Sequence, residues 1–163
     1  MNKISITILF LSLSMFSFSQ APLEKGNIQL NAGFGISSWS NPVYFGADYG
    51  VSDLITIGTE VSYQSYKQFS TTSTIIGIQA NGNYHFNELL NVPSIWDIYA
   101  GLNVNYYNWT IKNSNSSLID DEPFGLGGQI GVRYFFSEKF AFNLEFGGGN
   151  VNSGGKIGIT YKL

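Results

Sequence analysis

The stretch GVRYFFSEKFAFNLEFGGG, residues 131–149, contains two strongly alternating segments on either side of a short polar turn, Ser137-Glu138-Lys139. Apolar side chains share one parity in both segments: Val132, Tyr134, Phe136, Phe140, Phe142, Leu144 and Phe146. Polar side chains, among them Arg133, Asn143 and Glu145, share the other. Because successive side chains of a strand point to opposite faces, the pattern predicts a two-faced β-hairpin. The remaining sequence decides which face meets water.

The same alternation recurs along the chain in about eight segments, each near the length that a tilted membrane strand needs. The predicted strands cover roughly 27–36, 43–51, 55–64, 76–86, 98–106, 126–136, 140–149 and 156–163. Tight turns follow the second and sixth strands, and longer loops are expected at 37–42, 67–73, 112–124 and 150–154. The connection 87–96 is long although it lies on the side of the tight turns, and the alternation does not explain it. The sequence therefore predicts an all-β fold, an eight-stranded antiparallel up-and-down transmembrane β-barrel.

The first 19 residues have the pattern of an export signal. Lys3 supplies a positive charge, residues 4–18 form an apolar run broken only by Ser and Thr, and Ser17-Phe18-Ser19 offers small residues for cleavage. A transmembrane helix, the alternative, needs about 20 apolar residues, and this run is shorter. We therefore predict a cleaved signal peptide over residues 1–19 and one barrel domain over residues 20–163.

Composition restricts the classes of protein to which the chain can belong. Charged residues make up 12% of the 163 residues, about half the share of a soluble domain, so few charges are available to cover a water-facing surface. The net charge is −3 and no block of Lys or Arg occurs, which argues against nucleic-acid binding. No apolar run after residue 19 is long enough for a membrane helix. A membrane-spanning fold would then be a closed β-barrel, in which every backbone polar group finds a partner.

Two features of the sequence decide whether the apolar side chains point into the barrel or out of it. In a soluble barrel of lipocalin type the apolar side chains would point inward, and alternation alone does not exclude this alternative. The polar parity, however, is rich in Gly, Asn, Gln, Ser and Thr and poor in charge, which suits a narrow interior better than a water-exposed surface. Aromatic residues also gather near strand ends, as membrane interfaces favour: Tyr84, Phe86, Phe136, Phe140 and Tyr161 on the predicted periplasmic side, and Trp39, Tyr63, Tyr106 and Trp109 on the other. We therefore expect the apolar parity to face lipid.

An inward polar parity places a set of ionisable residues in the lumen: Asp48, Glu60, Glu145, Arg133, Lys156, Lys162 and His85. Their acidic and basic charges balance, as burial requires. If Phe136 pairs with Phe140, Arg133 and Glu145 become diagonal neighbours, so we predict a salt bridge between them. The cluster is either a plug or a gate whose ion pairs exchange to admit ions. An eight-stranded barrel is narrow enough to be filled by its own side chains, which favours the plug.

The residues give little support to an enzyme. The chain has one His and no Cys, so a histidine-based triad would have to use His85, with Ser62 and Asp48 as candidate partners. No G-x-S-x-G, H-E-x-x-H or glycine-rich phosphate-loop motif occurs. We interpret His85 as a hydrogen-bonded lumen residue and predict no catalytic or cofactor-binding site.

The predicted loop 112–124 carries three consecutive acidic residues, Asp120, Asp121 and Glu122. Carboxylates so close together are able to bind Ca²⁺ weakly, but the spaced pattern of an EF-hand is missing. A solvated acidic loop is the favoured interpretation, and no metal site is predicted.

The whole chain after the signal resembles the small outer-membrane β-barrel family, the OmpA-like and OmpX-like barrels of the porin type, in the form found in Bacteroidetes. The resemblance rests on the hairpins GVRYFFSEKFAFNLEFGGG and GADYGVSDLITIGTEVSYQ, on the connection FNELLNVPSIWDIYAGLNVNYY and on the final strand KIGITYKL. The chain ends in Leu163 where enterobacterial members end in Phe, and Tyr161 supplies an aromatic residue in that segment.

The resemblance implies an integral protein of the cell outer membrane, exported through the periplasm, with outer-membrane lipid and the barrel-insertion machinery as partners and no cofactor. A monomer with a structural or surface-interaction role is the leading expectation, although the partner of the outer loops is not specified. A narrow ion or small-solute channel is the alternative. A membrane-embedded lipid-modifying enzyme is a third, less favoured hypothesis.

Overall fold

The structure, a computed structural model, describes residues 22–68, 71–112 and 123–163, so the predicted signal peptide lies outside the described residues. The described chain forms a closed antiparallel barrel of eight strands, which confirms the predicted fold class. The strands are β1 (Ile28–Ser37), β2 (Val43–Ser52), β3 (Ile55–Gln68), β4 (Thr71–His85), β5 (Trp96–Lys112), β6 (Phe124–Phe135), β7 (Phe140–Gly149) and β8 (Ser153–Lys162). No helix among the described residues is long and apolar enough to cross a membrane.

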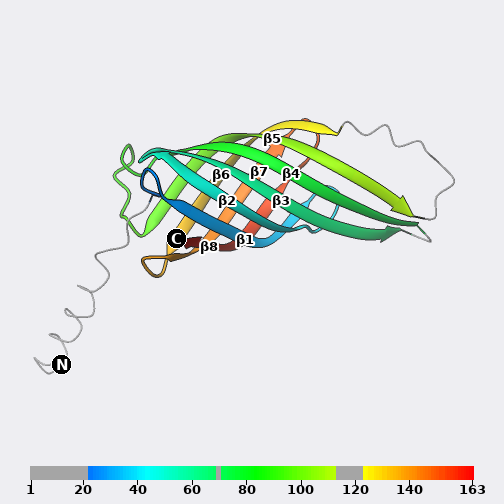
Figure 1. Ribbon diagram of the computed structural model, residues 1–163, viewed down its shortest axis with the longest axis horizontal. Coiled ribbons are helices and arrows are strands. Elements are labelled where there is room, and N and C mark those ends of the chain that lie inside the picture. The colour runs from blue at the N-terminus through cyan, green and yellow to red at the C-terminus, as the bar shows by residue number, and fades with distance from the viewer. Residues whose placement is uncertain (1–21, 69–70, 113–122) are drawn as a thin grey trace, which may run out of the picture.

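Each strand pairs with its sequence neighbours, and β1 closes the barrel against β8 (Figure 1). The β6–β7 hairpin has the register expected from the opening stretch, with Arg133 opposite Asn143 and Gly131 opposite Glu145. An even number of strands brings the start of β1 and the end of β8 to the same end of the barrel, which we call the terminal end. The opposite end is the loop end.

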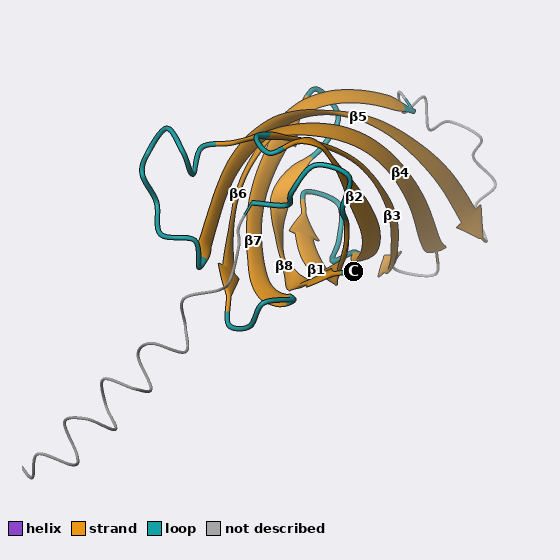
Figure 2. Cartoon of the chain, turned by 60° about the vertical axis from the view of Figure 1, so that its left-hand side comes forward, coloured by secondary structure: helices purple, strands orange, loops and turns teal. Residues whose placement is uncertain are grey.

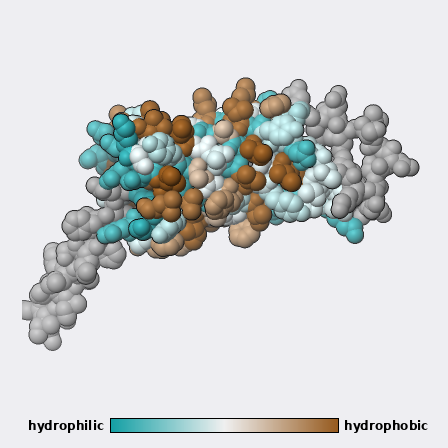
Figure 3. Space-filling view, in the orientation of Figure 1, coloured by the Kyte–Doolittle hydropathy of each residue, from teal (hydrophilic) through white to brown (hydrophobic). Residues whose placement is uncertain are grey.

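The apolar parity faces outward along the barrel. Phe142 is 55% exposed whereas its neighbour Asn143 is 6% exposed, and Leu102 is 75% exposed whereas Asn103 is 9% exposed. Hydrophobic side chains are spread over the middle of the outer surface, and hydrophilic ones gather toward the terminal end (Figure 3). The soluble alternative is therefore wrong, because the interior is polar and the apolar side chains have no core to enter.

Aromatic residues surround the outside of the barrel at the terminal end. Ring centroids lie 4.7 Å apart in Phe140 and Tyr161, 4.8 Å apart in Trp96 and Tyr134, and 5.0 Å apart in Tyr84 and Phe86. Such a belt suits the boundary between lipid and water.

Two aromatic residues predicted to lie in the belt at the loop end are placed differently. Trp109 shares the inward parity of β5 with Tyr107, and Trp39 packs against both rings with centroid distances of 4.7 and 4.8 Å. The prediction that Trp39 and Trp109 face lipid is therefore wrong. For Trp109, the prediction did not apply the alternation of β5, which places its odd-numbered residues in the lumen.

Strands β3, β4 and β5 are longer than predicted and project beyond the other strands at the loop end (Figures 1 and 2). Pairing of β3 with β4 continues to Gln68 and Thr71, so the loop expected at 67–73 is largely strand. Its Ser and Thr residues tolerate extended structure, and strand length is not limited by membrane thickness once the chain is in water. The acidic residues at positions 120–122 lie outside the described residues.

The long connection between β4 and β5 is ordered around one buried side chain. Asn87 donates through Nδ2 to the carbonyl of Trp96, and its Oδ1 accepts from the backbone N–H of Ile98 at 3.0 Å. The N–H of Val92 donates to the carbonyl of Asn87 at 2.9 Å. These bonds satisfy backbone groups that a loop would otherwise leave to water, which is how a long connection stays compact at this end.

Candidate functional site

Inward-facing side chains in the terminal half of the barrel form an ion cluster around Arg133. The guanidinium Nη2 lies 3.0 Å from Asp48 Oδ2 on β2, and Nη1 lies 2.9 Å from Asp97 Oδ2 on β5. The ring centroid of Tyr99 lies 4.2 Å from the guanidinium carbon. Arg133, Asp48, Asp97 and His85 are buried and are called the Arg133 cluster below.

The Arg133 cluster is stabilised by further hydrogen bonds, as buried charges require. Gln29 Nε2 and Asn31 Nδ2 each donate to Asp48 Oδ2 at 2.9 Å. Among the described residues, Arg133 Nε is the one guanidinium nitrogen without a hydrogen-bond partner. The cluster is therefore nearly saturated, and moving Arg133 would leave two carboxylates uncompensated.

His85 links the cluster to a hydroxyl group. Its Nδ1 lies 2.6 Å from Asp97 Oδ1, and its Nε2 lies 3.1 Å from Thr56 Oγ1. A hydroxyl, an imidazole and a carboxylate in this order resemble a catalytic triad, but Thr56 and His85 are 0% exposed and no substrate can reach them. Asp97 and Thr56 take the positions for which Asp48 and Ser62 were the sequence candidates. The arrangement accounts for His85 as a hydrogen-bonded lumen residue.

A second ion cluster lies nearer the loop end. Lys156 Nζ lies 3.0 and 2.9 Å from the two carboxylate oxygens of Glu60 and 2.8 Å from Glu145 Oε1. Tyr99 Oη donates to the remaining oxygen, Glu145 Oε2, at 2.8 Å. Lys156, Glu60 and Glu145 are called the Lys156 cluster, in which one ammonium lies between two carboxylates.

The predicted salt bridge between Arg133 and Glu145 is wrong. Glu145 lies directly opposite Lys156 in the β7–β8 pair, whereas Arg133 is only a diagonal neighbour on β6. Direct cross-strand partners are closer than diagonal ones, so the lysine takes the carboxylate. Arg133 instead reaches across the lumen to Asp48 on β2 and pairs with Asp97, its direct cross-strand partner on the neighbouring strand β5.

Lys162, also predicted in the lumen cluster, lies closer to the terminal end than either ion cluster. Its Nζ lies 4.1 Å from the ring centroid of Phe135, a cation–π contact. Phe135, Ala141 and Leu23 are 3%, 0% and 1% exposed, so an apolar layer lies at this end of the lumen. The predicted ionisable residues are thus spread over separate layers.

Asp97, Thr56 and Tyr99 take part in the lumen ion clusters, although none of them was among the predicted site residues. Asp97 falls between the predicted connection, 87–96, and the predicted fifth strand, 98–106, but β5 begins at Trp96 and places Asp97 opposite Arg133. The signal was available, because Asp97 continues the odd parity of Tyr99, Gly101 and Asn103. A neutral residue such as Thr56 carries no charge that would need a partner inside the lumen, so the sequence gives no comparable sign of its role.

Among the described residues, side chains of the ion clusters separate one lumen cavity from another. One of ≈ 100 Å³ opens toward the loop end, and one of ≈ 20 Å³ lies between Arg133 and Lys156. The second holds about one or two waters. Within residues 22–68, 71–112 and 123–163, no group of His, Asp and Glu side chains is arranged to hold a metal ion. Chemically, the arrangement closes the lumen.

Solved barrels have a similar fold. The outer membrane protein OprG from Pseudomonas aeruginosa has a TM-score of 0.66 and 14% identity over 88% of this chain and 99% of that chain. The N-terminal β-barrel domain of Pseudomonas aeruginosa OprF has a TM-score of 0.62 and 15% identity over 86% of this chain and 100% of that chain. A de novo designed transmembrane β-barrel has a TM-score of 0.60 and 17% identity over 86% and 98%. At these identities the likeness shows the fold alone.

The sequence comparisons address the family. No curated protein matches the sequence. A family model described as the outer membrane protein β-barrel domain matches residues 8–162, a range that includes every strand from β1 to β8. The polar lumen, the apolar outer surface and the closed up-and-down topology agree with this match. The chain belongs to the outer membrane protein β-barrel domain family.

Proposed function

We propose that this outer-membrane barrel has a structural role and that its lumen is sealed against solute flow. The observation that carries the proposal is the pair of ion clusters, in which Arg133 and Lys156 each bind two carboxylates from different strands. Opening the lumen would separate several buried charges at once, and each uncompensated charge costs several kcal/mol. The apolar layer of Leu23, Phe135 and Ala141 adds a further barrier.

The same proposal includes how the chain reaches and sits in the membrane. Residues 1–19 direct export and are removed, the barrel-insertion machinery inserts the chain, and the terminal end faces the periplasm. The barrel acts as a monomer, because closure of β1 on β8 satisfies the strand edges within the membrane without a partner.

The test uses the purified mature chain folded in detergent and then inserted into planar lipid bilayers. We expect a heat-dependent shift on an SDS gel, which marks a closed barrel, and no conductance steps. A narrow channel, the competing function, would give ion-selective steps whose size changes on Arg133→Ala. Such steps from the folded wild-type chain would refute the sealed lumen.

A second candidate role is surface interaction, and the extension of β3–β5 favours it. β3 pairs with β2 only as far as Tyr63, and β5 pairs with β6 only as far as Tyr106. Among the described residues, 64–68 and 108–112 therefore have no second strand partner and extend beyond the barrel wall. Exposed edges are able to accept an added strand from a partner. Replacing residues 65–74 by an Asn-Gly turn should reduce adhesion of cells that display the barrel while leaving the heat-dependent gel shift intact. Unchanged adhesion would remove this role.

We also propose that the barrel has no enzymatic activity. The only hydroxyl, imidazole and carboxylate series recorded among the described residues, Thr56, His85 and Asp97, is buried. A lipid-modifying enzyme needs its nucleophile within reach of a lipid.

A further inference from the structure

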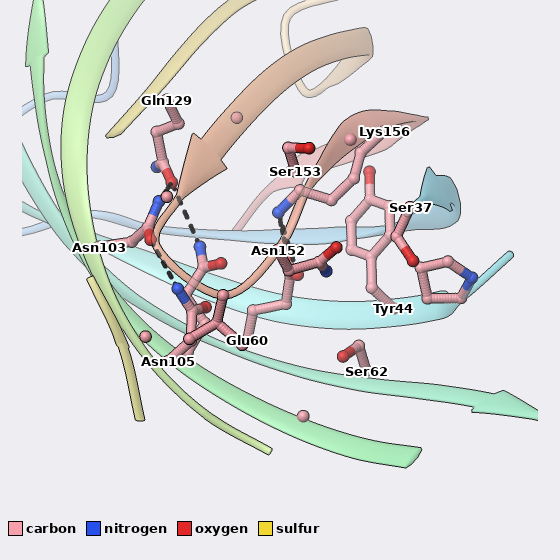
Figure 4. Close-up of a pocket in the computed structure, with 18 of the residues that line it drawn as sticks. Ser37, Tyr44, Glu60, Ser62, Asn103, Asn105, Gln129, Asn152, Ser153 and Lys156 are labelled. Carbon is pink, nitrogen blue, oxygen red and sulfur yellow. Dashed lines mark hydrogen bonds and ion pairs between the residues drawn. The ribbon is translucent and has the colours of Figure 1, made fainter. Parts of the chain in front are cut away.

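The loop-end half of the lumen contains the cavity of ≈ 100 Å³ (Figure 4). Glycine residues create it. The inward-facing positions of β6, β7 and β8 in this half are Gly125, Gly127, Gly147, Gly149 and Gly154. The same strands carry large inward side chains in the terminal half, including Arg133 and Phe135, which fill it. The hollow is therefore a consequence of where the sequence places side chains of different size.

The cavity is closed at its base. Lys156 and Glu60 line it, and Figure 4 shows the ion pair between them. The Arg133 cluster and the apolar layer lie beyond, toward the terminal end. A solute can therefore enter and leave only through the loop end, which is the geometry of a binding pocket and not of a pore.

The walls of the cavity combine polar and apolar side chains, and Lys156, the cation that lines the cavity, is paired with carboxylates. Lys156 donates to both carboxylate oxygens of Glu60 and forms an ion pair with Glu145, so one positive charge lies between two negative ones and an anion finds no available cation. The pocket therefore disfavours an anionic ligand.

Carboxamides on one wall are held in fixed positions by hydrogen bonds to one another. Asn105 Nδ2 donates to Asn103 Oδ1 at 2.6 Å, and Asn103 Nδ2 donates to Gln129 Oε1 at 2.8 Å. Gln129 Nε2 in turn donates to Asn83 Oδ1 at 2.7 Å. A preorganised row of amides can exchange hydrogen bonds with a ligand that carries several hydroxyl groups, without first losing side-chain entropy.

Aromatic rings complete the pocket. Tyr44 and Tyr107 line it, and Trp39 holds Tyr107 by an edge-to-face contact at 4.8 Å. A sugar ring has hydroxyl groups at its edge and C–H groups on its faces, so it can use both the amides and the aromatic surface. The volume corresponds to roughly seven to ten waters, the size class of a single sugar ring.

We propose that this cavity is a binding site for a neutral monosaccharide that enters from the loop end. The site is separate from the proposed sealing role, because a closed base is compatible with an occupied or an empty pocket. Binding would depend on the size of the cavity and on its amides, and not on any change in the plug.

The test is saturation-transfer difference NMR on the folded mature chain in a detergent without a sugar headgroup. The probes are D-glucose, D-galactose and N-acetyl-D-glucosamine, with glycine as a zwitterion of smaller size. Gly147→Leu fills the cavity from β7, since its Cβ would have Gly128 O as its nearest neighbour at 3.3 Å. Gly128→Leu is the matched control, because Gly128 faces outward and its Cβ would meet only Gly101 O at 3.6 Å. The heat-dependent gel shift reports whether each variant folds.

We expect saturable transfer to at least one of the sugars, weakened by about ten-fold or more in Gly147→Leu and unchanged within about two-fold in Gly128→Leu. If Gly147→Leu does not fold, Asn105→Leu takes its place, because it removes a lining amide without crowding the backbone. No saturable transfer to any sugar, transfer that survives the substitution, or saturation by glycine alone would each overturn the proposal.

Discussion

Arg133 Nη2 lies 3.0 Å from Asp48 Oδ2, and this ion pair joins β6 to β2 across the lumen between residues that are 85 positions apart in the sequence. Asp97 holds the other terminal nitrogen from β5 at 2.9 Å. One side chain thus links three walls of the barrel. Such a link resists both widening of the barrel and hydration of its interior.

Replacing Arg133 by Met should destabilise the folded barrel by about 3–5 kcal/mol, because two buried carboxylates lose their common partner. Urea unfolding of the barrel in phospholipid vesicles measures the change. Lys139→Met, in the exposed turn between β6 and β7, is the matched control and should have little effect. Equal effects of the two substitutions would mean that the Arg133 cluster contributes no more than a surface charge.

The pairing of Glu145 can be measured by double-mutant cycles. Glu145→Gln combined with Lys156→Met should show a coupling free energy of about 0.5–3 kcal/mol, because the two side chains are in contact. Glu145→Gln combined with Arg133→Met should show a smaller coupling, which acts only through Tyr99. A larger coupling to Arg133 than to Lys156 would restore the pairing that diagonal register predicts.

The orientation of the tryptophans can be tested with brominated lipids, which quench only indoles that contact acyl chains. Trp96, 39% exposed on the outward parity, should be quenched in the Trp39→Phe/Trp109→Phe variant. The two inward tryptophans should keep their fluorescence in Trp96→Phe. Strong quenching in Trp96→Phe would place Trp39 or Trp109 back in the lipid-facing belt.

Because the outer surface of the barrel faces lipid, lysine substitutions at two similarly exposed leucines should affect stability differently. Leu102 is 75% exposed between the aromatic ends of β5, and Leu89 is 70% exposed in the β4–β5 connection. Leu102→Lys should cost about 2–4 kcal/mol, since it places a charge near the centre of the bilayer. Leu89→Lys should be tolerated. If unfolding in vesicles shows both to be harmless, residue 102 contacts water and not lipid.

The Thr56→Val substitution tests whether the buried hydroxyl group of Thr56 has a structural or a catalytic role. The change leaves His85 Nε2 without its partner and should reduce the free energy of unfolding by about 1–3 kcal/mol. Mass spectrometry of outer-membrane lipids from cells that express either form should show identical acylation. A difference in acylation would show that the series from Thr56 to Asp97 carries out chemistry in spite of its burial.

Strand number, topology and the facing of each strand could all be predicted from the sequence. Alternation in segments such as 131–149 has a period of two residues, and that period assigns every side chain to one face once a strand is recognised. The scarcity of charge then decided that the apolar face is the outer one. Strand ends were predicted less well. The fifth strand was predicted to begin at residue 98, whereas β5 begins at Trp96, so Asp97 was not included among the predicted lumen residues.

The pairing of charges across the lumen was determined only by the tertiary structure. Which strands lie across the lumen from one another, and how far each side chain reaches, depends on closure of the whole barrel, and hairpin register describes neighbouring strands alone. Arg133–Asp48 and Lys156–Glu60 are such cross-lumen pairs, whereas Arg133–Asp97 and Glu145–Lys156 join direct partners on neighbouring strands. The sequence by itself determined the barrel and its two faces, because these follow from local periodicity. The layers of the plug and the cavity above them depend on contacts between residues distant in sequence, and only the folded chain brings those residues together.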